Sequence, residues 1–277
     1  MSDPYAVIGN PISHTKSPLI HGMFAQASGQ DMTYVALEGP LGGFAGAVDA
    51  FRRGGGRGLN VTAPFKLDAF DYANRRSQRA ELAGAANALR FDGETVEADN
   101  FDGVGLVRDV IHNLACPIRG KRVLLLGAGG ATRGALLPFL AEQPSELVVA
   151  NRDVSKAHTL AAIGMNSGLS KCPVKGLGYP DLQGQQFDLV FNATSASLTA
   201  ALPPVPASVF APDCLAYELA YGKGLTPFLR LAQGAGVPHL ADGVGMLVEQ
   251  AAEAFAWWRG VRPQTQAVIE RITVPLV

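Results

Sequence analysis

Hydrophobic positions follow two spacings along the first hundred residues. Short apolar runs typical of strands occupy residues 5–8, 33–37 and 58–62. Runs with apolar side chains three and four positions apart, typical of helices, occupy residues 17–27 and 43–51. This alternation predicts βαβ units around a mainly parallel sheet. Residues 67–88 also have a helical pattern, and residues 90–98 predict a hairpin that turns at Asp92-Gly93.

A second series of the same kind begins near Lys121. Its predicted strands are residues 122–126, 147–150, 187–191 and 215–218, and its predicted helices are residues 130–142, 154–163 and 245–259. The segment 164–184 is rich in Gly and Pro and fits neither spacing. The pattern therefore predicts an N-terminal α/β domain, a nucleotide-type α/β domain and a C-terminal helical segment.

The composition narrows the class of protein. With 277 residues, 48% of them hydrophobic and 17% charged, the chain can bury a core in one large or two modest domains. The formal net charge of −1 gives no electrostatic reason to expect nucleic acid or an anionic membrane. No membrane span, secretory signal, disulfide framework or metal motif is evident. We therefore expect a soluble, cytoplasmic protein.

A glycine-rich turn, Gly127-Ala-Gly-Gly-Ala131, follows an apolar strand and opens a predicted helix. In such a turn Gly127 permits the sharp bend and Gly129 lets the backbone approach a pyrophosphate, while the helix start offers free N–H groups to phosphate. Thr132 occupies the position of the last glycine of the usual motif. The turn predicts a dinucleotide site, with a purely structural strand–helix turn as the alternative.

The end of the next strand bears on the type of dinucleotide. Sites for NAD place an acidic residue there, whereas this chain has Asn151-Arg152, with Lys156 one helical turn later. Two cations on one helix face can hold a 2′-phosphate, which favours NADP over NAD. A solvated basic helix start is the alternative.

Two polar segments, residues 9–18 and 60–66, each follow a predicted strand. The hydroxyls of Thr15 and Ser17 suit a carboxylate ligand, and Thr62 could add a third hydroxyl. An isolated loop lysine such as Lys66 is usually only solvated. A position beside Asp102 would instead make it half of an acid–base pair.

In combination and order, these segments resemble the shikimate dehydrogenase family. The motifs that carry the resemblance span nearly the whole chain and are GNPISHTKSP, NVTAPFK, AGAANAL, DNFDGVGL, LLLGAGGATRG, NRDVSKA, NATSAS and DGVGMLVEQAAEAF. The resemblance implies a two-domain α/β fold. Residues 1–103 and 243–277 would form the substrate-binding and catalytic domain, and residues 104–242 a Rossmann-like NADP-binding domain.

The resemblance also implies NADPH-dependent reversible reduction of 3-dehydroshikimate to shikimate, with Lys66 and Asp102 as the acid–base pair. The implied substrate-binding residues are Thr15, Ser17, Thr62, Asn87, Tyr221 and Gln250. The implied NADP-binding residues are Gly127, Ala128, Gly129, Gly130, Ala131, Asn151, Arg152, Lys156, Leu219 and Gly243, the last two beside the nicotinamide. The expected partners are small molecules only, and the protein would be a monomer or a homodimer.

One departure from the family pattern leaves the substrate open. Where the family has Asn-Thr-Asp-Gly, this chain has Phe101 in place of the threonine. A phenyl ring that faced the substrate would reshape the pocket, and the protein could then be a paralogue that prefers quinate or a related cyclitol acid. A ring that faced the core would only fill space. An NADP-binding sensor without turnover is a further alternative, but it gives no reason to retain Lys66 and Asp102.

Overall fold

The chain forms two α/β units in the computed structural model, which describes residues 2–169, 171–196 and 201–277. The first unit comprises Met1–Gly105 and Val248–Arg271, and the second comprises Leu106–Leu247 and Ile272–Val277. Residues 243–247 and 272–277, which the sequence placed with the first domain, thus pack with the second unit. Close approaches explain this, because Gly245 lies against Asp109 and Gly224 lies against Val277.

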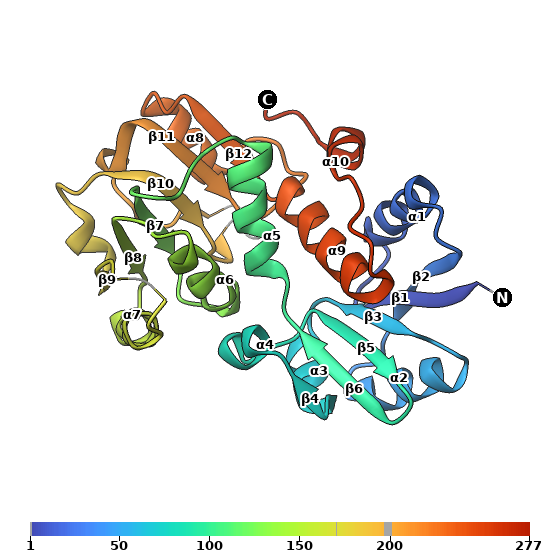
Figure 1. The fold of residues 1–277 in the computed structure, drawn as a ribbon. Helices are drawn as coiled ribbons and strands as arrows, with labels where there is room; N and C mark the ends of the chain where they lie inside the picture. Colours follow the sequence, from blue (N-terminus) through green and yellow to red (C-terminus); the bar gives the residue numbers. More distant parts are fainter. Residues whose placement is uncertain (1, 170, 197–200) are drawn as a thin grey trace. The chain divides into compact units, whose positions relative to one another are not determined.

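The first unit is built on a mixed six-stranded sheet of order β2-β1-β3-β5-β6-β4 (Figure 1). Its strands are β1 (Asp3–Gly9), β2 (Met32–Glu38), β3 (Gly58–Val61), β4 (Arg75–Arg76), β5 (Ala88–Asp92) and β6 (Thr95–Asp99). Its helices are α1 (Ser17–Ser28), α2 (Phe44–Arg53), α3 (Lys66–Tyr72), α4 (Gln78–Ala83), most of α9 (Val244–Arg259) and most of α10 (Gln266–Ile272). Strands β1, β2 and β3 are parallel, as predicted, whereas β5 runs antiparallel to both β3 and β6.

The prediction of one helix over residues 67–88 is wrong. Helix α3 ends at Tyr72, and β4 pairs with β6 before α4 begins. Ser77 caps α4 by accepting a hydrogen bond from the Ala80 N–H, and Gly84 ends it in the left-handed conformation. The helical periodicity is therefore interrupted by a tertiary strand pairing that local spacing does not reveal.

The second unit is built on an all-parallel six-stranded sheet of order β12-β11-β10-β7-β8-β9, which is Rossmann-like. Its strands are β7 (Arg122–Leu126), β8 (Glu146–Ala150), β9 (Val174–Leu177), β10 (Phe187–Asn192), β11 (Phe210–Glu218) and β12 (His239–Asp242). Its α-helices are α6 (Gly130–Ala141), α7 (Val154–Asn166) and α8 (Pro227–Gly234). It also contains a π-helix, η1 (Asp109–Asn113), and two short 3-10 helices, η2 (Tyr179–Leu182) and η4 (Ala207–Val209). Helix α5 (Asp102–Arg108) begins in the first unit and ends in the second.

Both faces of the second sheet are covered, which accounts for the continuous apolar sequence of β7. Helices α6 and α7 pack on one face, and η2 and α8 pack on the other. The segment that fitted no pattern contains β9, where a side chain at Gly176 would lie 2.5 Å from the backbone of α7. Glycine there allows helix and strand to approach closely. Because glycine has no side chain, the strand lacks the regular apolar spacing by which a sequence predicts a strand.

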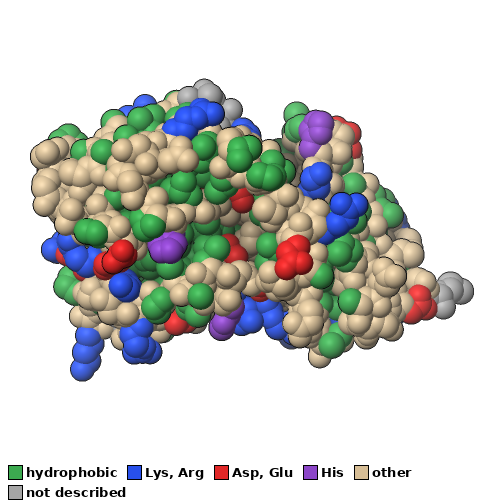
Figure 2. Space-filling view, turned by 90° about the horizontal axis from the view of Figure 1, so that it is seen from above, with side chains coloured by type: hydrophobic (Ala, Val, Ile, Leu, Met, Phe, Trp, Pro, Cys, Tyr) green, Lys and Arg blue, Asp and Glu red, His purple; other side chains and the backbone are tan. Residues whose placement is uncertain are grey.

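The surface agrees with the near-neutral composition. On the face shown in Figure 2, basic, acidic and apolar side chains are interspersed. Among the described residues, no helix combines the length and the apolar character needed to cross a membrane.

Candidate active site and cofactor site

Lys66 and Asp102 form a close ion pair in the first unit. Lys66 is the first residue of α3, and Asp102 is the first residue of α5, just beyond the end of β6. The Lys66 Nζ lies 2.6 Å from Asp102 Oδ2, and the side chains are 35% and 17% exposed. The pair is thus fixed by two helix starts and remains accessible from solvent.

Two further predicted residues extend this pair, since Asn87 bonds Asp102 and Gln250 bonds Asn87. The Asn87 side-chain amide donates to Asp102 Oδ1 at 2.8 Å and to Gln250 Oε1 at 3.2 Å. Gln250 comes this close because α9 packs against Gly105, where a Cβ would lie 2.6 Å from the Gln250 backbone nitrogen. The first unit therefore brings Lys66, Asn87, Asp102 and Gln250 together.

The two polar segments that were expected to bind the substrate touch each other. A side chain at Gly9 would lie 2.5 Å from the Thr62 methyl group, and the Asn10 N–H donates to the Ala63 carbonyl at 3.1 Å. Within the first segment the Thr15 hydroxyl donates to the Ser17 hydroxyl at 3.2 Å. The hydroxyls of Thr15 and Ser17 are thus neighbours, where the loop before α1 meets the start of that helix, and this loop is held against the one that leads to Lys66.

The side chain of Phe101 belongs to the core. It is 3% exposed and packs with Ala88, Ala254 and Trp257, whose ring it meets edge-on at 5.6 Å. Its backbone N–H donates to Asn87 Oδ1 at 2.9 Å. The ring therefore fills space inside the first unit, and the observation that suggested a reshaped substrate pocket is removed.

Asn100 and Asp99 support the start of α5, and the sequence reasoning assigned them no role. The Asn100 carboxamide accepts from the Asp102 N–H at 3.1 Å and donates to the Ala85 carbonyl at 3.1 Å. Asp99 accepts two hydrogen bonds from Arg79 and one from the Asn100 N–H. Their presence in the motif around Asp102 was the signal that could have identified them.

The glycine turn of the second unit has room for a phosphate group. Gly127 has a φ of +97°, and a Cβ there would lie 3.1 Å from the Thr194 methyl group. At Gly129 and Gly130, in contrast, a Cβ would meet no atom within 4 Å. Thr132 donates to the Gly127 carbonyl at 2.7 Å, so the residue that departs from the usual motif braces the turn. The open space at the start of α6 fits a pyrophosphate.

The segment after β8 combines a structural residue with two exposed cations. Asn151 accepts from the Ala128 N–H at 3.2 Å and donates to the Asp153 carbonyl at 2.9 Å, which ties this segment to the glycine turn. Arg152 and Lys156 are exposed, and within the part of the chain that the structure describes neither forms an ion pair. Both cations are therefore available to a phosphate.

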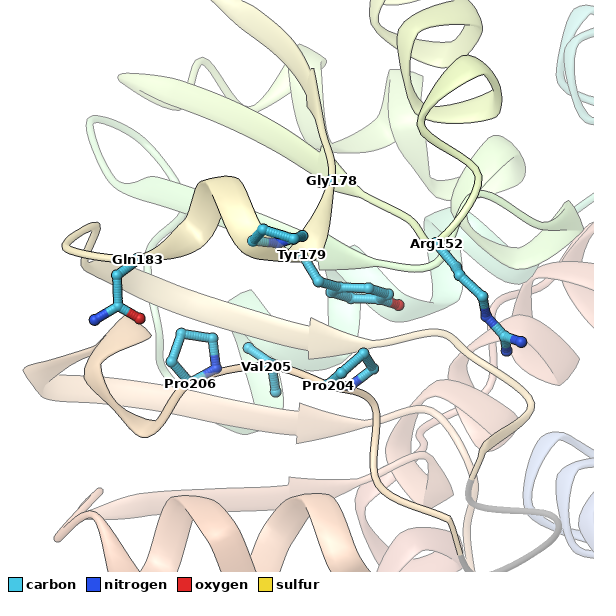
Figure 3. A pocket seen from close by; sticks show the side chains of 8 residues that line it. Arg152, Gly178, Tyr179, Gln183, Pro204, Val205 and Pro206 are labelled. Carbon is cyan, nitrogen blue, oxygen red and sulfur yellow. The ribbon is translucent and has the colours of Figure 1, made fainter.

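Arg152 stands at one end of a cavity of about 590 Å³ (Figure 3). Tyr179 and Pro204 line it, and the Tyr179 hydroxyl points toward the side of Arg152. Burial raises the pKa of Tyr179, while the positive charge of Arg152 acts in the opposite direction. The cavity thus lies beside Arg152, one of the two predicted phosphate-binding cations.

Leu219 and Gly243, both predicted beside the nicotinamide, are in contact. A Cβ at Gly243 would lie 2.1 Å from the Leu219 carbonyl oxygen, so only glycine fits there. The adjacent Glu218, to which no role was assigned, is fully buried and accepts from Asn192 at 2.9 Å and from Thr226 at 3.1 Å. Tyr221 lies in this second unit and is 42% exposed, whereas the other predicted substrate residues lie in the first unit.

A Rossmann-like unit with a phosphate-sized glycine turn, together with a unit that carries a Lys–Asp pair, defines the class of dinucleotide-dependent oxidoreductases. Family models match three segments of the chain. Residues 7–89 match the shikimate dehydrogenase substrate binding domain, residues 109–201 match shikimate / quinate 5-dehydrogenase, and residues 243–273 match the shikimate 5′-dehydrogenase C-terminal domain.

Comparison with individual proteins agrees with these family matches. The shikimate dehydrogenase (NADP(+)) of Nitrosospira multiformis is 55% identical over 97% of this chain and 96% of its own length. The crystal structure of an Ael1 enzyme from Pseudomonas putida is 63% identical, covers 100% of both chains and has a TM-score of 0.93. That of shikimate 5-dehydrogenase from Thermus thermophilus, in complex with NADP(H) and shikimate, is 29% identical, covers 97% of both chains and has a TM-score of 0.83. The chain belongs to the shikimate dehydrogenase family, which confirms the resemblance found in its motifs.

Proposed function

We propose that this protein catalyses the NADP-dependent, reversible reduction of 3-dehydroshikimate to shikimate, with Lys66 and Asp102 as its acid–base pair. The observation that carries the assignment of the pair is the 2.6 Å contact between Lys66 and Asp102 in an accessible position. The relatives named shikimate dehydrogenase (NADP(+)) support the reaction and the cofactor.

Reduction of a ketone places negative charge on its oxygen, and the protein must neutralise that charge. NADPH, when bound, would supply the hydride for the carbonyl carbon. The Lys66 ammonium stabilises the developing charge and donates a proton to the oxygen, and in the reverse direction the lysine takes that proton back. Asp102 holds Nζ through Oδ2, and its Oδ1 is held in turn by Asn87.

The remaining predicted residues are assigned to binding. We assign Thr15 and Ser17 to the substrate carboxylate. We assign Thr62, Asn87, Tyr221 and Gln250 to the substrate hydroxyls or the edge of the carboxylate. The pyrophosphate of NADP would lie against the residues of the glycine turn from Gly127 through Ala128, Gly129 and Gly130 to Ala131. Asn151, Arg152 and Lys156 would hold the 2′-phosphate side, and Leu219 and Gly243 would border the nicotinamide. Residues 1–103 and 243–277 would then serve substrate binding, and residues 104–242 would serve NADP binding.

A direct assay tests this proposal. Purified protein, shikimate and NADP⁺ should give a rising absorbance at the NADPH band, and quinate and NAD⁺ should give a much smaller kcat/KM. No turnover with either ring acid would refute the enzymatic function and favour a binding protein without catalysis. The buried ring of Phe101 gives no support to a preference for quinate. We further propose that the protein is cytoplasmic. We also propose that it is a monomer or a homodimer, and light scattering distinguishes these two states by their molar mass.

A further inference from the structure

Asn192 and Glu218 form a buried pair at the carboxyl ends of two neighbouring strands of the second unit. Asn192 is the last residue of β10, and Glu218 is the last residue of β11. Both residues are 0% exposed, and the Asn192 amide nitrogen donates to Glu218 Oε2 at 2.9 Å. Open α/β sheets bind their ligands outside the carboxyl ends of the strands, so the pair lies at the sheet edge where the cofactor is expected.

Asn192 connects the glycine turn with the segment after β11. Its Oδ1 accepts from the hydroxyl of Thr194 at 2.7 Å and from the N–H of Thr194 at 3.2 Å. The Thr194 methyl group borders the glycine turn, because a Cβ at Gly127 would lie 3.1 Å from it. The Asn192 backbone carbonyl accepts from the Leu219 N–H at 3.0 Å. One residue thus holds a neighbour of the turn and a residue proposed to border the nicotinamide.

Glu218 holds the segment after β11 from its other side. Its Oε1 accepts from the Ala220 N–H at 3.3 Å, and its Oε2 also accepts from the Thr226 hydroxyl at 3.1 Å. The Ala220 carbonyl in turn accepts from the Gly243 N–H at 3.3 Å. Leu219 lies between Glu218 and Ala220 in the chain, so both proposed nicotinamide residues, Leu219 and Gly243, are tied to this carboxylate.

We infer that Asn192 and Glu218 are positioning residues that fix the nicotinamide end of NADP relative to the glycine turn. The inference rests on the proposed function, because it needs the nicotinamide beside Leu219 and Gly243. The amide of Asn192 donates on one side and accepts on the other, and the carboxylate of Glu218 only accepts. Displacement of either side chain leaves a buried donor without a partner, so the network favours one arrangement. The segment is therefore ordered before the cofactor binds.

Exchange of the two functional groups tests the pair as a unit. Glu218→Gln leaves one oxygen, which cannot serve the donors at both ends of the side chain, so a buried donor loses its partner. Asn192→Asp places a second carboxylate against Glu218. In the double variant, the new glutamine amide donates to the new aspartate carboxylate, the glutamine oxygen still accepts from Ala220, and the Thr226 hydroxyl turns to accept. The double variant therefore restores the network that each single variant breaks.

Binding measurements localise the effect to the nicotinamide end. By calorimetry, Glu218→Gln should raise the Kd for NADP⁺ about tenfold. It should raise the Kd for adenosine 2′,5′-bisphosphate, which has the 2′-phosphate but no nicotinamide, by less than about twofold. It should also lower kcat with shikimate about 10- to 100-fold, because the hydride acceptor is misplaced. The double variant should return the Kd for NADP⁺ and kcat to within about threefold of wild type.

Glu146→Gln is the matched control. Glu146 is another buried glutamate of the same parallel sheet, but it is the first residue of β8 and so lies at the opposite end of the strands. Its carboxylate accepts from Arg122 and Lys175. The control should lower the melting temperature and leave the Kd for NADP⁺ and kcat within about twofold of wild type. It therefore shows the effect of destabilisation alone.

The outcomes distinguish the inference from the function on which it rests. Failure of the wild type to bind NADP⁺ would overturn both. A wild type that binds NADP⁺ and oxidises shikimate, together with an unchanged Kd for NADP⁺ in Glu218→Gln, would overturn the inference alone. Equal weakening of NADP⁺ and the bisphosphate would also overturn it, because the effect would then extend over the whole unit.

The double variant decides by itself if a single variant fails to fold. Wild-type affinity for NADP⁺ in Asn192→Asp/Glu218→Gln would support the inference. A tenfold loss of affinity in the double variant, or its failure to fold, would overturn the inference, because the exchanged groups can form the same hydrogen bonds.

Discussion

Replacement of Lys66 by methionine separates the catalytic from the structural contribution of the ion pair. Methionine keeps an unbranched stem of similar length and removes the ammonium. The pair is short, with 2.6 Å between Nζ and Oδ2, but Lys66 is 35% exposed, so its contribution to folding is about 1 kcal/mol or less. Loss of a positioned proton donor, in contrast, typically lowers the rate by about 10²- to 10⁴-fold, or roughly 3–5 kcal/mol of activation free energy.

We therefore expect Lys66→Met to lower kcat by at least about 100-fold, while the free energy of unfolding changes by about 1 kcal/mol or less. The assay is steady-state oxidation of shikimate at saturating NADP⁺, with urea unfolding of the same preparations. The affinity for NADP⁺ should stay near wild type, because the proposed NADP-binding residues lie in the second unit. Fluorescence titration measures that affinity.

Lys121→Met provides the control. Lys121 also pairs with an aspartate, Asp188, at 4.0 Å, but it lies in the second unit, at the end of β7 opposite to the glycine turn. The Lys121→Met variant should retain the wild-type kcat. A kcat within about threefold of wild type in Lys66→Met would refute the acid–base assignment, since a proton donor at this position is worth far more.

Four further substitutions test other parts of the site. Phe101→Thr should leave the ratio of kcat/KM for shikimate and quinate within about twofold of wild type, but destabilise the protein by about 3 kcal/mol in urea unfolding, because it empties a core position. A changed ratio would contradict the core assignment. Arg152→Ala should raise the KM for NADP⁺ about 10- to 100-fold and that for NAD⁺ far less, since only the former has a 2′-phosphate; equal effects would exclude phosphate recognition. Gly129→Ala should raise the KM for NADP⁺ and leave the melting temperature unchanged. Gly127→Ala should lower the melting temperature, because of these two glycines only Gly127 has a positive φ. A lower melting temperature in Gly129→Ala than in Gly127→Ala would contradict the description of the turn.

The architecture could be predicted from the sequence where local pattern and tertiary structure agree. The apolar strand before Gly127, the turn itself and the helix after it were all evident, because each follows from short-range spacing. Prediction failed where long-range contacts decide. Strand β4 exists only through its pairing with β6, and β9 carries a glycine because α7 lies against it. Neither contact leaves a trace in local periodicity.

In the candidate site, too, local sequence pattern fails to predict what long-range contacts decide. Lys66 and Asp102 could be proposed together only because a family resemblance joins segments 36 positions apart, since no local rule relates them. Asn100 was assigned no role because no local pattern shows that its side chain holds the Asp102 N–H, a contact that only the folded structure reveals.

The motif around Asp102 shows why one of its letters can change while the site remains. Asn100 contributes its side chain, which holds the Asp102 N–H, and Asp102 contributes its carboxylate. Between them, residue 101 contributes its backbone N–H, which any residue except proline provides and which orients Asn87. Its side chain points into a core formed by Ala88, Ala254 and Trp257, so the constraint on it is volume. Phenylalanine meets that constraint, because α9 and β5 present small residues on one side and a large ring on the other. A substitution inside a functional motif therefore implies a new substrate only where the altered side chain, and not the backbone, faces the reaction.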